Sequence, residues 1–219
     1  MQYAVKTTGS APAHVTVLDA DATPLQAPRV QKARSPSEVH LWEPRPGTPY
    51  LYTLHITCGA DVYDQTFGVR SIEVRGTQVL LNGKPLYFKG FCKHEDFTAH
   101  GRGFDPVLNV KDVNLIHWQT PTRCVPALPY AEEFYDLCDR EGILVMDETP
   151  AVGIGGGAAV NPYKEYPCGA SPAGACRDDP SGQKPPCVVL WSLATSRIWS
   201  TSRRMPYDYW HRCMSWPHQ

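Results

Sequence analysis

Alternating hydrophobic and polar positions dominate the first 90 residues. Between residues 50 and 57, apolar or aromatic side chains occupy every second position, which predicts a half-buried β-strand. Residues 62–69 and 72–74 continue this signal, and a weaker alternation surrounds Val15 and Val17. Two apolar runs, 79–81 and 86–88, flank Asn82-Gly83, a dipeptide typical of a tight hairpin turn. The first part of the chain is therefore predicted to be β-structure.

The hydrophobic period changes near residue 130. Four apolar residues recur at the spacing of one helix face: Tyr130, Phe134, Leu137 and Cys138. Gly142 can end this helix, and the continuous apolar run 143–146 follows at once. A helix followed by a fully apolar strand is the unit of a parallel sheet, and residues 187–191 predict a second such strand. The second part is therefore predicted to be α/β.

Polar residues directly follow these apolar runs. Asp147 and Glu148 close the run 143–146, and His94-Glu95-Asp96 follows the run 86–91. In β/α barrels the C-terminal ends of the strands carry the chemistry, so these side chains are candidate site residues. The alternative is structural, because strand-end acids also cap the next segment or are simply solvated. The sequence leaves both interpretations open.

Composition excludes several classes of function. The chain has 219 residues, with 22 acidic residues against 21 Lys plus Arg and a net charge of -1. Such a chain lacks the basic excess that binding to nucleic acid requires. No apolar run reaches the roughly 18 residues of a membrane span. Met1 to Ser10 contain no apolar stretch typical of a secretory signal, so we expect a cytoplasmic protein.

Cysteine spacing argues against a metal centre. The chain has eight cysteines, none of them in a C-x-x-C pair, and the eight histidines do not supply the missing ligand pairs. An even number of cysteines permits disulfides, but without a signal sequence we expect reduced thiols. We therefore predict neither a metal site nor a cofactor.

Seven short segments stand in an informative order. They are Phe67–Ile72, Leu81–Gly90, Lys93–Asp96, Gly101–Asp105, Tyr130–Glu133, Asp139–Ile143 and Asp147–Gly153. Together they resemble family 2 glycoside hydrolases, in particular the β-glucuronidase branch of that family. Several motifs in one order are far more specific than any single motif. The resemblance is continuous from about Leu41 to Pro167 apart from one break.

The resemblance implies an α/β, multidomain architecture. Residues 1–75 would be the remnant of an immunoglobulin-like β-sandwich, and residues 76–219 the N-terminal half of a (β/α)₈ TIM barrel. The barrel half is expected to be incomplete and disrupted at 119–129, 168–186 and 195–219, where the resemblance stops and later resumes. Frame-disrupting changes in a coding sequence produce such interruptions, so a decayed gene is one hypothesis for the origin of this chain.

Departures from the family pattern decide the expected activity. The family has its acid/base glutamate in the motif Trp-Ser-x-Ala-Asn-Glu-Pro, whereas here Trp191–Ala194 is followed by Thr195 and Ser196. Retaining glycosidases need two carboxyl groups, and a hydroxyl group is not acidic at neutral pH. The family's nucleophile belongs to a later strand, which we expect to be absent. We therefore predict no catalytic residues and no hydrolysis by this chain.

The surviving strand-end residues could still shape a sugar site. By resemblance the expected partner is a carbohydrate, a β-glucuronide, and the expected substrate-binding residues are His94, Asp96, Asp147, Glu148 and Trp191. The alternative function is a non-catalytic remnant that binds carbohydrate or a partner, including association with another chain through the open barrel edges. Unrelated chemistry at Asp147-Glu148 is a third possibility.

Overall fold

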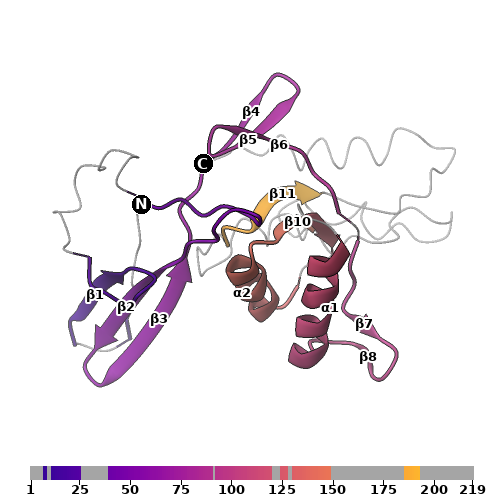
Figure 1. Ribbon diagram of the computed structural model, residues 1–219. Helices are drawn as coiled ribbons and strands as arrows, with labels where there is room; N and C mark the ends of the chain where they lie inside the picture. Colours follow the sequence, from indigo (N-terminus) through magenta and orange to yellow (C-terminus); the bar gives the residue numbers. More distant parts are fainter. Residues whose placement is uncertain are drawn as a thin grey trace, which may run out of the picture.

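The computed structural model describes residues 7–8, 11–25, 39–90, 92–119, 124–127, 130–148 and 185–192. Short strands and two helices make up these residues, and Figure 1 shows their arrangement. In chain order they are β1 (Ala13–Leu18), β2 (Tyr52–Cys58), β3 (Asp61–Phe67), β4 (Ile72–Arg75), β5 (Gln78–Leu81), β6 (Lys84–Leu86), β7 (Asp96–Phe97), β8 (Gly101–Arg102), α1 (Pro106–Gln119), β9 (Cys124–Ala127), α2 (Glu132–Glu141), β10 (Leu144–Glu148) and β11 (Val188–Ser192).

An antiparallel sheet in the order β1-β2-β3 forms the N-terminal part. Its register places Val15, Ile56 and Tyr63 side by side, so one face of the sheet is apolar. The opposite face carries polar neighbours, including His55, whose Nδ1 lies 2.6 Å from Asp64 Oδ1. The predicted β-structure of this region is therefore confirmed.

The Asn82-Gly83 hairpin is also confirmed. Strands β4, β5 and β6 form a small antiparallel sheet, and the turn between β5 and β6 is this dipeptide. Asn82 has φ 52° and Gly83 has φ 76°, the two left-handed positions that a twisted two-residue hairpin requires. Asn82 also ties the hairpin to the rest of the chain, because its amide donates to the Trp42 carbonyl at 3.0 Å.

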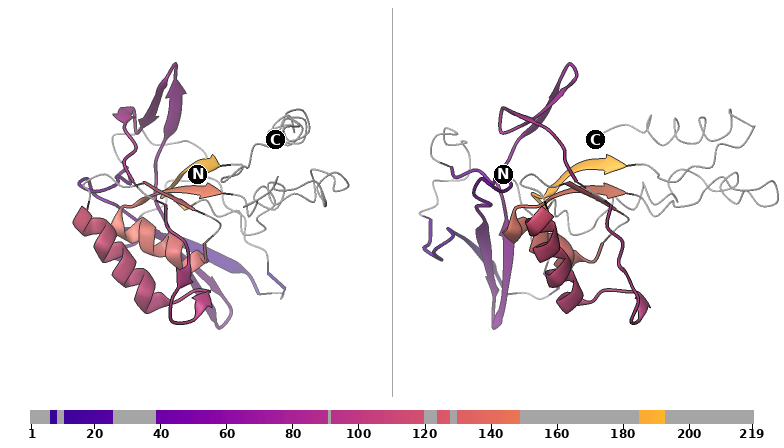
Figure 2. Two further views of the ribbon diagram at one scale, coloured as in Figure 1. Left: turned by 90° about the vertical axis from the view of Figure 1, so that its right-hand side faces the viewer. Right: turned by 45° about the vertical axis from the view of Figure 1, so that its right-hand side comes forward.

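The parallel sheet has the order β11-β10-β9. Both pairings of β10 are parallel. The two apolar runs predicted the pairing with β11, whereas β9 was not predicted. Helices α1 and α2 lie on the same side of this sheet (Figures 1 and 2). This arrangement follows from the connectivity, since a crossover helix between parallel strands packs back onto the sheet. The described residues thus form one helix-covered section of a β/α barrel.

Helix α2 matches its predicted signals. Glu132 and Glu133 lie in the first turn and Arg140 in the last, where each charge complements the helix dipole. Gly142 ends the helix with φ 66°, and the Ile143 N–H donates to the Cys138 carbonyl at 3.0 Å. A Cβ at Gly142 would lie only 2.9 Å from the Arg45 nitrogen, so the close chain approach also requires glycine.

Helix α1 was not predicted, although its start carries a clear signal. Pro106 occupies the first helical position, and the Leu108 N–H donates to Asp105 Oδ1 at 3.0 Å. This hydrogen bond is the main reason that the pKa of Asp105 is lowered. The hydrophobic period is blurred because Asn109 is on the buried face while Trp118 is exposed.

Strand β9 lies within the segment 119–129, where the family resemblance is interrupted. Residues 124–127 pair in parallel with β10, with Pro126 opposite Met146. Proline lacks an N–H and is tolerated in a strand with a neighbour on one side only, and β10 is the one described neighbour of β9. The family's sequence motif is absent from this segment, but residues 124–127 still pair with β10. Residues 168–184 and 195–219 lie outside the described residues, and the domain bounds remain predictions.

The hydrophobic core is centred on α2 and β10. Phe134, Cys138 and Leu144 are fully buried there, and Cys187 joins them from the start of β11. Trp42 is also fully buried in this cluster, although it precedes the β2 strand. The segment before β2 is therefore held by the barrel layer as well as by its own sheet.

Candidate functional site

The C-terminal ends of β10 and β11 lie at the same level. Asp147 is paired with Trp191, and Glu148 with Ser192. The two strand ends therefore meet at one edge of the parallel sheet. Because this edge carries the chemistry in β/α barrels, it is the candidate site.

The Asp147 side chain contacts helix α2. Its side chain is buried and interacts with the Tyr135 hydroxyl, and the Tyr130 N–H donates to the same hydroxyl at 3.2 Å. Burial raises the pKa of Tyr135, and the neighbouring Asp147 charge raises it further. Asp147 thus faces the helix layer. Such a contact fits a structural role, the alternative to sugar binding that the sequence left open. Direct sugar binding by Asp147 remains a prediction.

His94 and Asp96 lie close together in the segment that precedes α1 in the sequence. His94 Nδ1 lies 3.4 Å from Asp96 Oδ2, and both side chains are more than half exposed. They do not follow a continuous strand as expected, because β6 ends at Leu86 and the described residues 87–90 contain only a bridge at Gly90. His94 is therefore a loop residue, and the structure tests neither its substrate contact nor that of Asp96.

Lys93 anchors this loop, a role that the sequence analysis missed. Its buried ammonium lies 3.2 Å from Asp112 Oδ2 on α1. Three aromatic rings surround it, with centroids 5.4 Å (Phe97), 5.5 Å (Tyr130) and 5.0 Å (Phe134) from Nζ. The charge is thus balanced by one carboxylate and by ring faces. The Tyr130 hydroxyl also donates to the Lys93 carbonyl at 2.9 Å, which fixes the backbone beside His94.

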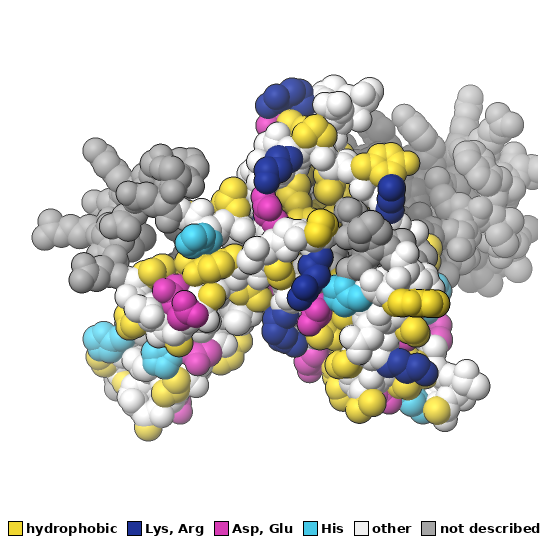
Figure 3. Space-filling model, in the orientation of Figure 1, with side chains coloured by type: hydrophobic (Ala, Val, Ile, Leu, Met, Phe, Trp, Pro, Cys, Tyr) yellow, Lys and Arg dark blue, Asp and Glu magenta, His cyan; other side chains and the backbone are white. Residues whose placement is uncertain are grey.

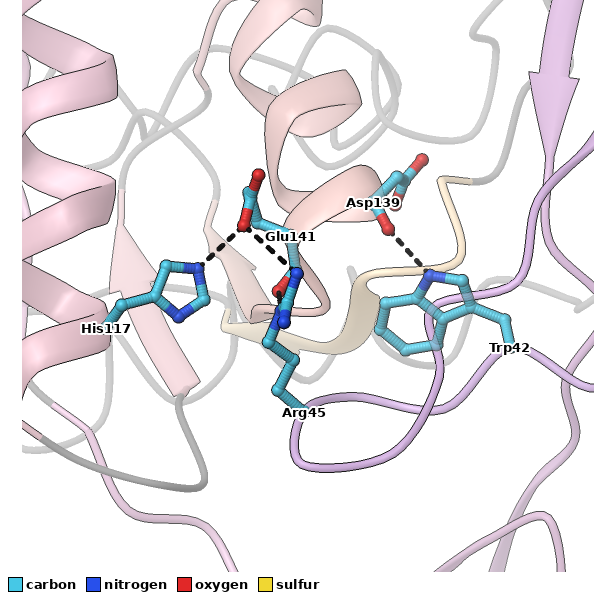
Figure 4. A network of polar contacts seen from close by, with 5 residues as sticks. All are labelled: Trp42, Arg45, His117, Asp139 and Glu141. Atoms are coloured by element: carbon cyan, nitrogen blue, oxygen red, sulfur yellow. Dashed lines mark hydrogen bonds and ion pairs between the residues drawn. The ribbon is translucent and has the colours of Figure 1, made fainter. Parts of the chain in front are cut away.

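A second polar network joins the segment before β2 to the C-terminal end of α2 (Figure 4). Trp42 Nε1 donates to the Asp139 carbonyl at 2.9 Å, and Arg45 Nε donates to the Glu141 carbonyl at 3.2 Å. His117 Nε2 lies 3.0 Å from Glu141 Oε2. Because α2 ends where β10 begins, this network lies away from the strand ends. Its position indicates a role in stability rather than in binding.

Asp139 and Arg70 fix the start of β11. The Asp139 carboxylate accepts a 2.8 Å hydrogen bond from the Cys187 N–H, and burial raises the pKa of Asp139 to about 6. The Arg70 guanidinium donates to the carbonyls of Pro186 and Val188. Burial has the opposite effect on the guanidinium and lowers the pKa of Arg70. These contacts hold the start of β11 in place, at the strand end opposite the candidate site.

The remaining predicted residues have limited structural description. Thr195 and Ser196 lie outside the described residues, and Glu148 and Trp191 are placed by their strand positions. Within the described ranges, no three His, Cys, Asp or Glu side chains gather closely enough to hold a metal ion. No helix in the same ranges is long and apolar enough to cross a membrane. Four cysteines of the described ranges are free thiols: Cys58, Cys92, Cys138 and Cys187.

Two family profiles match the chain. The profile described as "Glycosyl hydrolases family 2, TIM barrel domain" matches residues 72–211, and "Glycosyl hydrolases family 2" matches residues 1–70. The chain belongs to family 2 of the glycosyl hydrolases. The predicted resemblance is thus confirmed, as is the fold class of a sandwich-type domain followed by a TIM barrel that is unclosed in the described residues.

The most similar proteins include several β-glucuronidases. The Paenibacillus borealis enzyme is 48% identical over 121 residues, which cover 52% of this chain and 20% of that protein. The human enzyme is 38% identical over 170 residues, covering 71% and 25% of the two chains. This chain therefore spans about a fifth to a quarter of the curated relatives.

Solved structures extend the likeness to nearly the whole chain. Faecalibacterium prausnitzii β-glucuronidase is 71% identical, with a TM-score of 0.80 over 96% of this chain and 36% of its own. Bifidobacterium dentium β-glucuronidase, solved with coumarin-3-O-glucuronide, is 38% identical, with a TM-score of 0.68 over 90% and 34%. The resemblance to β-glucuronidases expected from the sequence is thereby confirmed.

Proposed function

We propose that this chain contributes the glucuronide-binding edge of a β-glucuronidase-type barrel and does not hydrolyse glucuronides by itself. The observation that carries the proposal is the shared C-terminal edge of β10 and β11, with Asp147 beside Trp191. Similar β-glucuronidases have been solved with a glucuronide and with a uronic isofagomine, which supports a carbohydrate as the ligand class.

The chemistry of the exposed loop fits a sugar hydroxyl. His94 and Asp96 lie 3.4 Å apart and are open to solvent, so a hydroxyl could donate to the carboxylate and accept from the imidazole. The Lys93 anchor holds their backbone in place. Preorganised polar groups of this kind lower the entropic cost of binding. We therefore assign His94 and Asp96 to hydroxyl binding, together with the β10 and β11 ends.

The absence of hydrolysis is proposed from the sequence after Ala194. Thr195-Ser196 stands where the family resemblance places Asn and the acid/base Glu. A retaining glycosidase needs a carboxylic acid to protonate the leaving oxygen and a second carboxylate about 5–5.5 Å away. Neither Thr195 nor Ser196 can donate a proton at neutral pH.

A chromogenic β-glucuronide tests the proposal directly. We expect no release of chromophore above the protein-free level, whereas F. prausnitzii β-glucuronidase serves as the positive control. Turnover that Glu148→Gln abolishes would contradict the proposal, because it would show a working carboxylate at the strand end. Far-UV circular dichroism of each protein would confirm that the comparison is made between folded chains.

A second candidate function is binding to another polypeptide. It is favoured by β11, which pairs with β10 alone among the described strands. An apolar strand edge that no described strand covers can accept a further strand. Light scattering of the purified chain would show whether it associates. The expected cytoplasmic location remains a prediction, which cell fractionation would check.

A further inference from the structure

We propose that Arg102 makes the sugar site specific for acidic sugars, because its guanidinium binds the carboxylate of a β-glucuronide. This inference rests on the proposed glucuronide binding and adds a residue that the sequence analysis did not single out. It follows from the small antiparallel ribbon of β7 and β8, which brings Arg102 beside one of the proposed hydroxyl-binding residues.

The register of the ribbon places Arg102 next to Asp96. Asp96 is paired with Arg102, and Phe97 is paired with Gly101. Directly opposed residues of two antiparallel strands project to the same face, with Cβ atoms about 4.5–5.5 Å apart. The Asp96 carboxylate on this face lies 3.4 Å from His94 Nδ1. Arg102 therefore shares one face of the ribbon with the acidic member of that pair.

The other face of the ribbon packs on the protein. The centroid of the Phe97 ring lies 5.4 Å from the buried Lys93 ammonium. Because successive side chains of a strand alternate between its two faces, Asp96 and Arg102 project away from Lys93. Both residues are exposed. Figure 3 shows basic, acidic and histidine side chains together at the surface in the region of β7 and β8.

Two contacts hold the ribbon in place. The Gly103 N–H donates to the Glu95 carbonyl at 3.1 Å, which continues the pairing beyond the two short strands. His100 Nε2, in the connection between them, lies 3.3 Å from Asp105 Oδ2 at the start of α1. The backbone that carries Arg102 is thus fixed before a ligand arrives, which lowers the entropic cost of binding.

The Arg102 guanidinium is available to a ligand. Among the residues that the structure describes, no acidic side chain lies within ion-pair distance of it, and Asp96 lies close to His94 instead. Arg45 and Arg75, in contrast, are each close to a glutamate. An exposed guanidinium presents a planar fork of N–H donors that matches a carboxylate. The chemistry of the unoccupied partner is therefore that of a carboxylate.

A β-glucuronide offers the matching groups on one ring. Its carboxylate and one of its hydroxyls are attached to adjacent ring carbons, so a single sugar can present the hydroxyl to Asp96 and the carboxylate to Arg102. The ligands of two similar enzymes, coumarin-3-O-glucuronide and uronic isofagomine, are both named as uronic acid derivatives. A neutral β-glucoside has a hydroxymethyl group in place of the carboxylate and offers Arg102 no charge.

Two glycosides that differ only in this group test the inference. p-Nitrophenyl β-D-glucuronide and p-nitrophenyl β-D-glucoside would be titrated into the full chain by isothermal titration calorimetry. Arg102→Gln should weaken glucuronide binding about tenfold and leave glucoside binding unchanged, because it removes charge-assisted hydrogen bonds. Arg102→Lys keeps the charge but not the planar fork, so its affinity for the glucuronide should lie between the two.

Arg75→Gln is the matched control. Arg75 is an exposed arginine on β4, outside the ribbon and close to Glu73, so this variant should bind both glycosides like the parent chain. Equal losses for the two glycosides in Arg102→Gln would show that Arg102 acts only through Asp96 and would overturn the inference. Unchanged binding of both would overturn it as well, and in either case glucuronide binding itself would stand. A parent chain that binds neither glycoside would instead contradict the proposed function, and the assignment of Arg102 with it.

Discussion

The parallel sheet and the antiparallel sheet bury their apolar residues to different degrees. In β10, Leu144 and Val145 are fully buried beneath α2, whose Phe134 and Cys138 are also inaccessible. In the β1-β2-β3 sheet only Tyr52 and Leu54 are buried, and the first four residues of β3 are exposed. Both sheets have an apolar face, so the difference comes from what covers it.

A second layer decides how much a sheet contributes to stability. The parallel sheet receives its helices from the chain that connects its own strands, so most of its helix-side core is complete in the described residues. An antiparallel sheet of a sandwich must instead pack on another sheet. Val15, Ile56 and Tyr63 share one face in register, yet Tyr63 is 57% exposed. The folding free energy should therefore come mainly from the barrel section.

The largest expected effect is at Phe134. Phe134→Ala should lower the free energy of unfolding by about 3–5 kcal/mol, because it removes a fully buried ring from the core. Ile56→Ala in β2 should cost under about 2 kcal/mol, since its side chain is only partly covered. Urea denaturation followed by circular dichroism measures both values. Equal losses would contradict the difference between the two sheets.

The next effect concerns the pH dependence caused by Asp139. Burial raises its pKa from 3.8 to about 6, so the folded chain binds the proton more tightly than the unfolded chain does. The contribution of Asp139 to stability is therefore largest below pH 3.8 and falls by about 3 kcal/mol as the pH rises through 6.

Asp139→Asn removes this titration. Relative to the parent chain, the variant should gain stability as the pH is raised from about 4 to 6.5, and the difference should level off above that range. Thermal unfolding at a series of pH values measures the difference. Asp61→Asn, at an exposed position of β3, is the control for the removal of one carboxylate from the surface. A difference that stays constant with pH would argue against a buried, proton-binding Asp139.

Lys93 allows a comparison between a buried and an exposed ion pair. Lys93→Met keeps most of the apolar stem but leaves Asp112 without its cation, so we expect a loss of about 1–3 kcal/mol, allowing for the partial exposure of Asp112. Lys84→Met removes an exposed pair with Glu43 and should cost at most about 0.5 kcal/mol. Similar losses of unfolding free energy for the two variants, measured by chemical denaturation, would show that burial does not strengthen the Lys93-Asp112 pair.

The smallest expected effect is at the hairpin turn. Gly83→Ala should cost about 1 kcal/mol, because Gly83 has φ 76° although a Cβ would meet no atom within 4 Å. Gly103→Ala is the control, since a Cβ there also meets nothing and the backbone has no positive φ. Thermal denaturation of the two variants separates backbone strain from packing. A loss at Gly103 as large as at Gly83 would contradict this explanation.

The sequence predicted those elements whose conformation is determined by a few neighbouring residues. The Asn82-Gly83 turn and the helix ending at Gly142 each depend on conformations that one or two residues determine. Helix α1 was missed because Asn109 interrupts its buried stripe while Val107 and Trp118 are exposed. Its Asp105-Pro106 start was the available signal. Periodicity fails where a helix has apolar residues on several faces.

The candidate site was only partly predictable for a different reason. Counting residues after an apolar run placed Asp147 at a strand end, and the register with Trp191 agrees. The same count could not show that Tyr135 engages Asp147, because that contact depends on how α2 packs on β10. Lys93 was overlooked since lysines are rarely buried. Its aromatic surroundings come from β7, from α2 and from Tyr130, two residues before α2.

Hydrogen exchange with and without uronic isofagomine, a ligand of a Ruminococcus gnavus relative, tests the central claim most directly. We propose that the sugar site lies on the barrel section, with no contribution from the antiparallel sheet. We expect slower exchange at residues 92–96, 144–148 and 188–192 when the ligand is present, and unchanged exchange in β1, β2 and β3. Protection confined to the antiparallel sheet, or no protection at a saturating ligand concentration, would contradict the account.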